Sequence, residues 1–134
     1  MLQFRPSVYT TAHLEDMTFD SFCTYCNQKR GVTEEFPFDA NTLVFKVMGK
    51  MFALTNIERL PLTINLKCDP EWAIELRETY ESVQAGYHMN KKHWNTVVSD
   101  DTIPDVELRS FIDHSYDLVV KGLKKADREK LAAL

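Results

Sequence analysis

The sequence predicts an α+β protein, a two-layer sandwich in which three helices pack on one face of an antiparallel sheet of about five strands. Two observations support this. Helical and strand patterns follow one another in the order helix, three or four strands, helix, two strands, helix. Successive strand patterns are separated by loops too short for a helical crossover, so they pair as hairpins and give an antiparallel sheet.

The first helix is expected at residues 18–30. Thr18 is a suitable N-cap, Met17 and Phe22 occupy the positions of a hydrophobic staple, and Gly31 can end the helix. Four residues at helical spacing predict its buried face: Phe19, Phe22, Cys23 and Cys26.

The first strands follow this helix. Pro37 restricts any strand at 34–38 to a short or edge position, because proline cannot donate to a strand ladder. Residues 43–48 and 51–55 predict a hairpin. Gly49-Lys50 would form its two-residue loop, and glycine in the first loop position suits a type II′ turn.

Residues 62–68 alternate between apolar and polar side chains, which is typical of a strand with one buried face. Asp69-Pro70-Glu71 then predicts a helix start, with Asp69 as N-cap, Pro70 in the first turn and Glu71 near the positive end of the helix dipole. This second helix is expected to run to about Glu81.

A second hairpin is expected from residues 84–89 and 93–99, turning near Asn90-Lys91. The last helix is expected at about 105–123, because apolar side chains recur there at helical spacing. We therefore expect one domain at residues 17–128. It would be preceded by a loose N-terminal arm, 1–16, and followed by a C-terminal tail, 129–134.

The composition predicts a water-soluble, cytoplasmic protein. The chain has 134 residues, of which 44% are hydrophobic and 27% charged, and a net charge of −4. No apolar run is long enough to span a membrane. The N-terminus has no apolar signal segment, and three cysteines is an odd count for a disulfide framework.

Positive charge is concentrated in the two expected hairpins. Residues 40–68 carry four basic side chains and one acidic one, and residues 86–97 carry two lysines and no acid. Residues 69–81 carry five acids and one arginine. Lys46 and Lys67 alternate with apolar residues, so we expect them on the sheet face that points away from the helices.

Catalysis and metal binding are not expected. Cys23-Thr24-Tyr25-Cys26 is a CxxC motif, but it lies within a helix on the apolar side, where structural cysteines are usual. His88 and His93, even with His114 and Cys68, have no spacing that enforces a zinc site. Neighbouring helical residues such as Asp113, His114 and Ser115 point in different directions and cannot form a catalytic relay. We expect no cofactor.

Four segments, in the same order along the chain, resemble the MmcQ/YjbR family of small bacterial proteins. They are Lys46–Leu54 (KVMGKMFAL), Leu66–Glu71 (LKCDPE), Gly86–Val97 (GYHMNKKHWNTV) and Ile112–Val119 (IDHSYDLV). The resemblance covers roughly residues 18–128. It implies a fold related to secretion chaperones and to CyaY-like (frataxin-like) proteins, and it implies DNA binding.

Together these features predict a DNA-binding protein, regulatory and not an enzyme. The lysines would contact phosphates, and the remaining residues would contact bases or position the backbone. The candidate residues are Lys46, Lys50, Lys67, Asn90, Lys91, Lys92, His93 and Trp94. The alternative is a peptide- or protein-interaction module, with a protein partner or a homodimer. In that case residues 86–97 would be a structural keystone that contacts the last helix at His114 and Tyr116.

Overall fold

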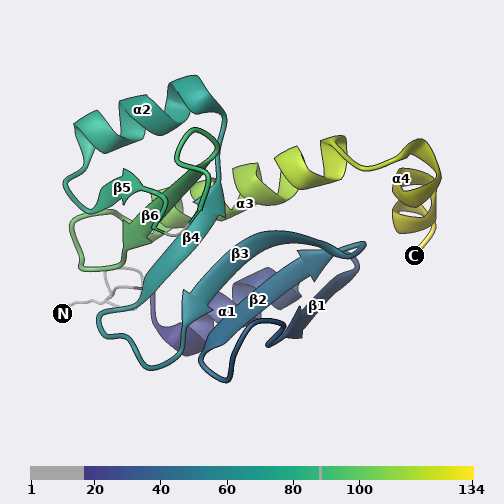
Figure 1. The fold of residues 1–134 in the computed structure, drawn as a ribbon, viewed down its shortest axis with the longest axis horizontal. Coiled ribbons are helices and arrows are strands. Elements are labelled where there is room, and N and C mark those ends of the chain that lie inside the picture. The colour runs from purple at the N-terminus through teal and green to yellow at the C-terminus, as the bar shows by residue number, and fades with distance from the viewer. Residues whose placement is uncertain (1–16, 88) are drawn as a thin grey trace, which may run out of the picture.

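The chain forms one antiparallel sheet with a layer of helices on one side, as the computed structural model of residues 17–87 and 89–134 shows (Figure 1). The elements in order are α1 (Phe19–Asn27), β1 (Val32–Glu35), β2 (Thr42–Val47), β3 (Lys50–Asn56), β4 (Thr63–Lys67), α2 (Pro70–Thr79), β5 (Val83–Ala85), β6 (Trp94–Val98), α3 (Asp105–Lys121) and α4 (Lys125–Ala132). The strand order is β1-β2-β3-β4-β6-β5, and every neighbouring pair is antiparallel. The predicted fold class is confirmed, with one strand and one helix more than expected. The expected N-terminal arm lies outside the described residues.

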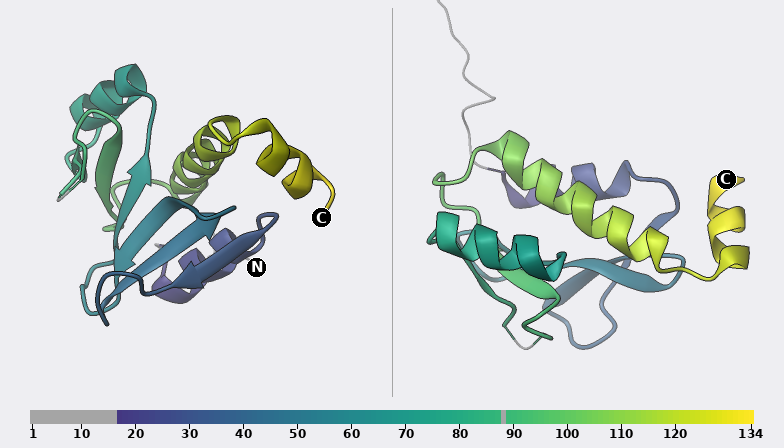
Figure 2. Two further views of the ribbon diagram at one scale, coloured as in Figure 1. Left: turned by 45° about the vertical axis from the view of Figure 1, so that its right-hand side comes forward. Right: turned by 90° about the horizontal axis from the view of Figure 1, so that it is seen from above.

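Helix α3 is the middle of the helical layer and lies between α1 and α2 (Figure 2). On one side, the Tyr25 hydroxyl of α1 donates a hydrogen bond to the Asp113 carboxylate of α3 over 2.6 Å. On the other side, the Trp72 ring of α2 packs edge-on against Phe111 of α3, with ring centroids 5.5 Å apart. The helices therefore hold one another as well as the sheet.

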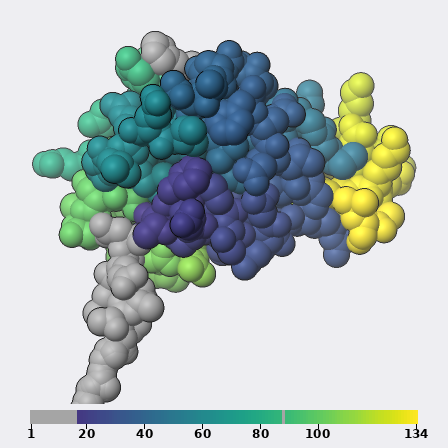
Figure 3. All heavy atoms as spheres, turned by 90° about the horizontal axis from the view of Figure 1, so that it is seen from below, coloured from purple at the N-terminus to yellow at the C-terminus, as the bar shows by residue number. Residues whose placement is uncertain are grey.

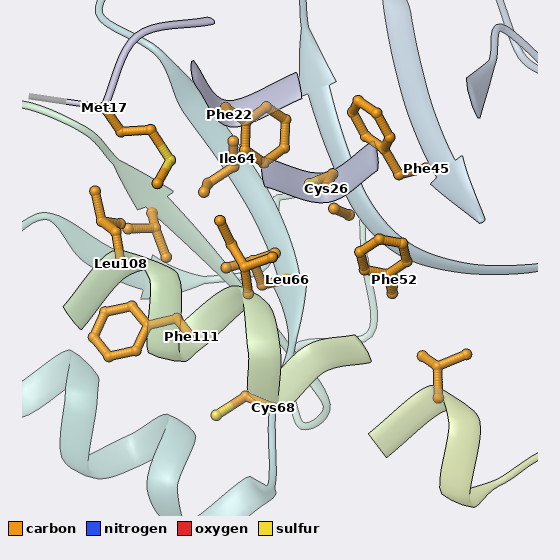
Figure 4. Close-up of a cluster of buried hydrophobic side chains, with 14 of the residues drawn as sticks. Met17, Phe22, Cys26, Phe45, Phe52, Ile64, Leu66, Cys68, Leu108 and Phe111 are labelled. Carbon is orange, nitrogen blue, oxygen red and sulfur yellow. The ribbon is translucent and has the colours of Figure 1, made fainter. Parts of the chain in front are cut away.

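The main core fills the space between the helices and the sheet (Figure 4). Phe22 of α1 packs edge-on against Phe45 of β2, with centroids 5.4 Å apart. Burying a side chain of this size stabilises the fold by about 1.5–3 kcal/mol. The alternation predicted for residues 62–68 is confirmed, since these four side chains are buried on the helix side: Leu62, Ile64, Leu66 and Cys68.

Strands β3 and β4 separate at one end, and α3 closes the gap. Their pairing stops at Ala53 opposite Leu66. At this point the register between β2 and β3 shifts, and Phe52 is the β3 residue that has no partner on β2. At this point the Ser115 hydroxyl donates to the Phe52 carbonyl over 2.6 Å and accepts from the Lys67 amide over 2.9 Å. Ser115 thus replaces the ladder bond that the two strands cannot form.

The neighbours of Ser115 anchor α3 to other elements. His114 Nε2 accepts a hydrogen bond of 3.1 Å from the Asp69 amide, at the N-cap of α2. The Tyr116 hydroxyl donates to the Arg30 carbonyl over 2.6 Å, in the turn before β1. Ser115 therefore points inward from α3, while His114 and Tyr116 bond partners at the edges of this helix.

Two expectations, one at a turn and one on a helix face, were wrong. The β2–β3 loop is Met48-Gly49, with Val47 paired to Lys50, and the loop residues have φ of 49° and 80°. Two positive φ values define a type I′ turn, so the type II′ turn at Gly49-Lys50 is not formed. Phe19 is exposed, because it lies on the outer side of the first turn of α1.

The second hairpin and the C-terminus also differ from expectation. Strand β5 has only three residues, so the loop between Ala85 and Trp94, described at residues 86, 87 and 89–93, is longer than the tight turn expected near Asn90-Lys91. The expected tail begins inside helix α4, which forms a lobe at one end of the molecule (Figure 3). Leu131 is the buried residue of this helix.

Replacing Ser115 with alanine should lower the free energy of unfolding by about 2–4 kcal/mol, because the Phe52 carbonyl and the Lys67 amide would lose their shared partner. Urea unfolding followed by circular dichroism measures this. The matched control is Ser110→Ala, since among the described residues the Ser110 hydroxyl bonds only the Glu107 carbonyl, at the exposed side of the same helix. The control should change stability by less than about 0.5 kcal/mol. Equal effects of the two substitutions would contradict the bridging role.

Candidate functional site

The candidate site is the outer face, which we define as the face of the sheet opposite α1, α2 and α3. Part of this face is apolar. Val44, Leu54 and Trp94 form a second buried cluster there, with Met51 and Met89 packed against it. Met89 comes from the loop at residues 86–93, so this loop folds over part of the outer face. The rest of the face carries polar side chains, among them those of Thr63, Asn65 and Lys67.

A tight approach to β6 fixes the start of the loop. The Gly86 amide donates to the Trp94 carbonyl over 2.8 Å. A Cβ at Gly86 would lie 2.9 Å from both the Trp94 Cβ and the Trp94 carbonyl oxygen, closer than side chains tolerate. Because glycine has no side chain, the backbone at Gly86 can pass this close to Trp94 of β6.

Polar bonds fix the rest of the loop. Asn90 Oδ1 accepts from the amides of Lys92 (2.9 Å) and His93 (3.3 Å), and Lys91 Nζ donates to the Gly86 carbonyl (3.0 Å). Arg77 of α2 donates to the Lys91 carbonyl. The loop is thus tied to α2 and to itself.

The structure gives the predicted loop residues different roles. Asn90 and Lys91 shape the loop, while Lys92 is exposed and its side chain bonds no other described residue. The His93 carbonyl accepts the Cys68 amide over 2.8 Å. Trp94 is only 9% exposed and packs on the outer face, so its ring offers no free face for stacking on bases. The expected keystone contacts with α3 are not formed by Trp94, because α3 lies across the sheet.

Two of the predicted strand lysines lie on the outer face. Lys46 pairs with Met51 and Lys67 pairs with Trp94, and both partners belong to the outer-face cluster. Lys50 pairs at the tip of the β2–β3 hairpin with Val47, a residue of the helix-side core, so its side chain starts on the other side of the sheet. Lys46 forms an ion pair with Glu35 of β1, whereas the side chains of Lys50 and Lys67 form none with the described residues.

A groove on the outer face was missed by the sequence analysis. It has a volume of about 430 Å³, within the range of small-ligand sites. Its floor is formed by β3, β4 and β6, and its rims by the segments that connect the strands. The lining residues are Phe38, Asp39, Thr42, Met51, Leu54, Thr55, Asn56, Arg59, Thr63, Asn65, Tyr87, Met89 and Thr96. No pattern in the sequence signals the groove, because its lining comes from segments that are far apart in the chain.

The cysteines do not form a reactive site. Burial raises the pKa of the Cys23 thiol to about 11 and that of Cys68 to about 12, and burial likewise raises the pKa of Cys26. All three are free thiols. The residues Asp113, His114 and Ser115 each bond different partners and none of the three bonds another. Burial lowers the pKa of His114, consistent with its Nε2 acting as an acceptor.

Within residues 17–87 and 89–134, no three His, Cys, Asp or Glu side chains lie close enough to hold a metal ion. No helix in these ranges combines the length and the apolar character needed to cross a bilayer.

The fold and site define a small α+β protein with one helix-covered and one open sheet face. The family model YjbR matches residues 27–118, so the chain belongs to the YjbR family. It is 33% identical over 119 residues to the uncharacterised protein YjbR of Escherichia coli (strain K12), covering 88% of this chain and 100% of the relative. It is 42% identical over 96 residues to the uncharacterised protein YbdF of Escherichia coli O157:H7, covering 72% and 79%.

A solved structure supports the same grouping. The crystal structure of a Deinococcus radiodurans protein of domain DUF419 superposes with a TM-score of 0.81 at 45% identity, covering 87% of this chain and 88% of the other. A Pseudomonas syringae crystal structure gives 0.66 at 28% identity, covering 76% and 98%. The resemblance noted in the sequence is confirmed at the level of the family.

The raised thiol pKa values predict slow alkylation of the native protein. At pH 8 a thiol with a pKa of about 11 is only about 0.1% thiolate, the form that reacts. Iodoacetamide should therefore label Cys23 in urea roughly a hundredfold faster than in the native state. Because the pKa is raised, native labelling should increase about tenfold per pH unit from pH 8 to 10. Rapid labelling of native protein at pH 7 would contradict this environment.

Proposed function

We propose that the protein is a non-enzymatic, cytoplasmic DNA-binding protein with a regulatory role, which contacts phosphates through the outer face. The observation that carries the proposal is that Lys46 and Lys67 lie on this face, paired with Met51 and Trp94 of its apolar cluster, while Lys50 is exposed at the nearby hairpin tip. Lys92 adds a fourth cation, because its loop leads directly into β6 beside Lys67. Lysines grouped on one surface are the usual electrostatic footprint of phosphate binding.

The distribution of acids supports the choice of face. Glu71, Glu75 and Glu78 are exposed on α2, in the helical layer. An approaching polyanion is thus repelled from the helical layer and attracted to the lysines of the sheet. Since Lys46 is paired with Glu35 and Lys91 is bonded within its loop, Lys50, Lys67 and Lys92 are the main phosphate ligands in this proposal. Asn90, His93 and Trp94 then act by positioning the loop.

A second candidate function is binding of a protein partner. Four large apolar side chains are exposed in the segments that follow β1 and β3: Phe36, Phe38, Ile57 and Leu60. The Ile57 amide donates to the Asn41 carbonyl over 2.8 Å, which joins the two segments. Exposed apolar groups that lie together often mark a protein interface. A peptide bound there would show weak salt dependence, in contrast to DNA.

The variant Lys50→Glu/Lys92→Glu tests the main proposal, because neither side chain has a structural partner among the described residues. Fluorescence anisotropy with labelled DNA at about 50 and 200 mM salt should show wild-type binding that weakens steeply with salt. The variant should bind at least about tenfold more weakly at the lower salt. The matched control is Lys125→Glu/Lys130→Glu on α4, which makes the same charge change away from the outer face.

Two results would contradict the proposal. One is the absence of wild-type binding to any DNA at the lower salt. The other is an equal loss in the α4 control, which would show an effect of net charge alone.

A further inference from the structure

We propose that the groove of the outer face holds an unpaired segment of nucleic acid, with bases stacked on its exposed rings. This inference rests on the proposed function and adds the strandedness of the ligand. The starting observation is the groove, which lies on the same face as Lys46 and Lys67. Contacts between lysines and phosphates would not need such a groove.

Two exposed aromatic side chains line the groove. Phe38 is 64% exposed and lies before β2, and Tyr87 is 60% exposed and lies after β5. The strand order places β3, β4 and β6 between these two segments, so the rings stand on opposite sides of the groove. Exposed rings bind unpaired bases because each base has a free π-face, whereas the bases of a duplex are already stacked on one another.

The floor of the groove supplies donors for base edges. Thr96 Oγ1 accepts from the Tyr87 amide over 2.9 Å and donates to Asn65 Oδ1. This fixes the Asn65 amide, and its Nδ2 group bonds no other described residue. A base carbonyl or ring nitrogen in the groove can therefore accept from Asn65.

Charge complementarity favours nucleic acid over an uncharged peptide. Arg59 lines the groove and forms no ion pair with a described residue, so its guanidinium can hold a phosphate. Asp39 is the acid in the lining, and it accepts hydrogen bonds from the Asn41 and Thr42 amides of its own loop.

The path of the strand follows β4. Thr63, Asn65 and Lys67 are alternate residues on its outer side, because each is paired with an outward residue of β6. They run from the groove to the end of β4. A single strand laid along this line would have bases in the groove and its next phosphate at Lys67.

Fluorescence anisotropy of a labelled single strand of about 12 nucleotides, a site size usual for small single-strand binders, and of its duplex tests the inference. Wild type should bind the single strand at least about tenfold more tightly. Phe38→Ala/Tyr87→Ala should lose about tenfold or more of that affinity and little of the duplex affinity, and Phe38→Tyr should retain it. Val106→Ala, at an exposed apolar position on α3, is the control.

Each contrary outcome has a distinct meaning. Equal binding of single strand and duplex, or an unaffected Phe38→Ala/Tyr87→Ala variant, overturns the groove inference but leaves the phosphate contacts standing. No binding of either nucleic acid overturns both proposals. If a labelled amphipathic peptide binds and only its binding is lost in the variant, the groove inference is overturned in favour of a protein partner.

Discussion

The hydroxyl of Ser115 connects two strands at the place where their own ladder ends. Its bonds to the Phe52 carbonyl and the Lys67 amide fix α3 against the middle of the sheet. The residues on either side, His114 and Tyr116, then fix α2 and the turn before β1 to the same helix. Because buried backbone groups must be paired, this arrangement allows the sheet to open without leaving orphaned groups. Through these bonds the helices cover one face of the sheet.

The opposite face of the sheet is covered only in part, by a loop and not by a described helix. Val44 and Leu54 are buried on that side although no described helix covers them, because the loop at residues 86–93 brings Met89 onto them. The loop covers only part of the sheet, and the uncovered part forms the groove. Lys46, Lys67 and the groove share this face. The acidic helix α2 lies in the helical layer, on the other face of the sheet.

Features set by local chemistry could be predicted from the sequence. The alternation at 62–68 and the N-cap at Asp69 were recognised because each depends on adjacent residues. Helix α4 was missed because its sequence is polar, with Leu131 as its one buried residue. The outward positions of Lys46 and Lys67 could be predicted from strand alternation. The burial of Trp94 and the groove could not, because both depend on segments brought together by pairing of β4 with β6.

The central claim is that the outer face, and not the helical layer, binds nucleic acid. Titration of a single-stranded oligonucleotide into ¹⁵N-labelled protein, followed by NMR, tests it most directly. The account predicts that the amide signals that shift at low ligand ratios belong to Arg59, Asn65, Thr96 and the loop at 86–93. Shifts concentrated on the exposed sides of α2 and α3, with these signals unmoved, would contradict it.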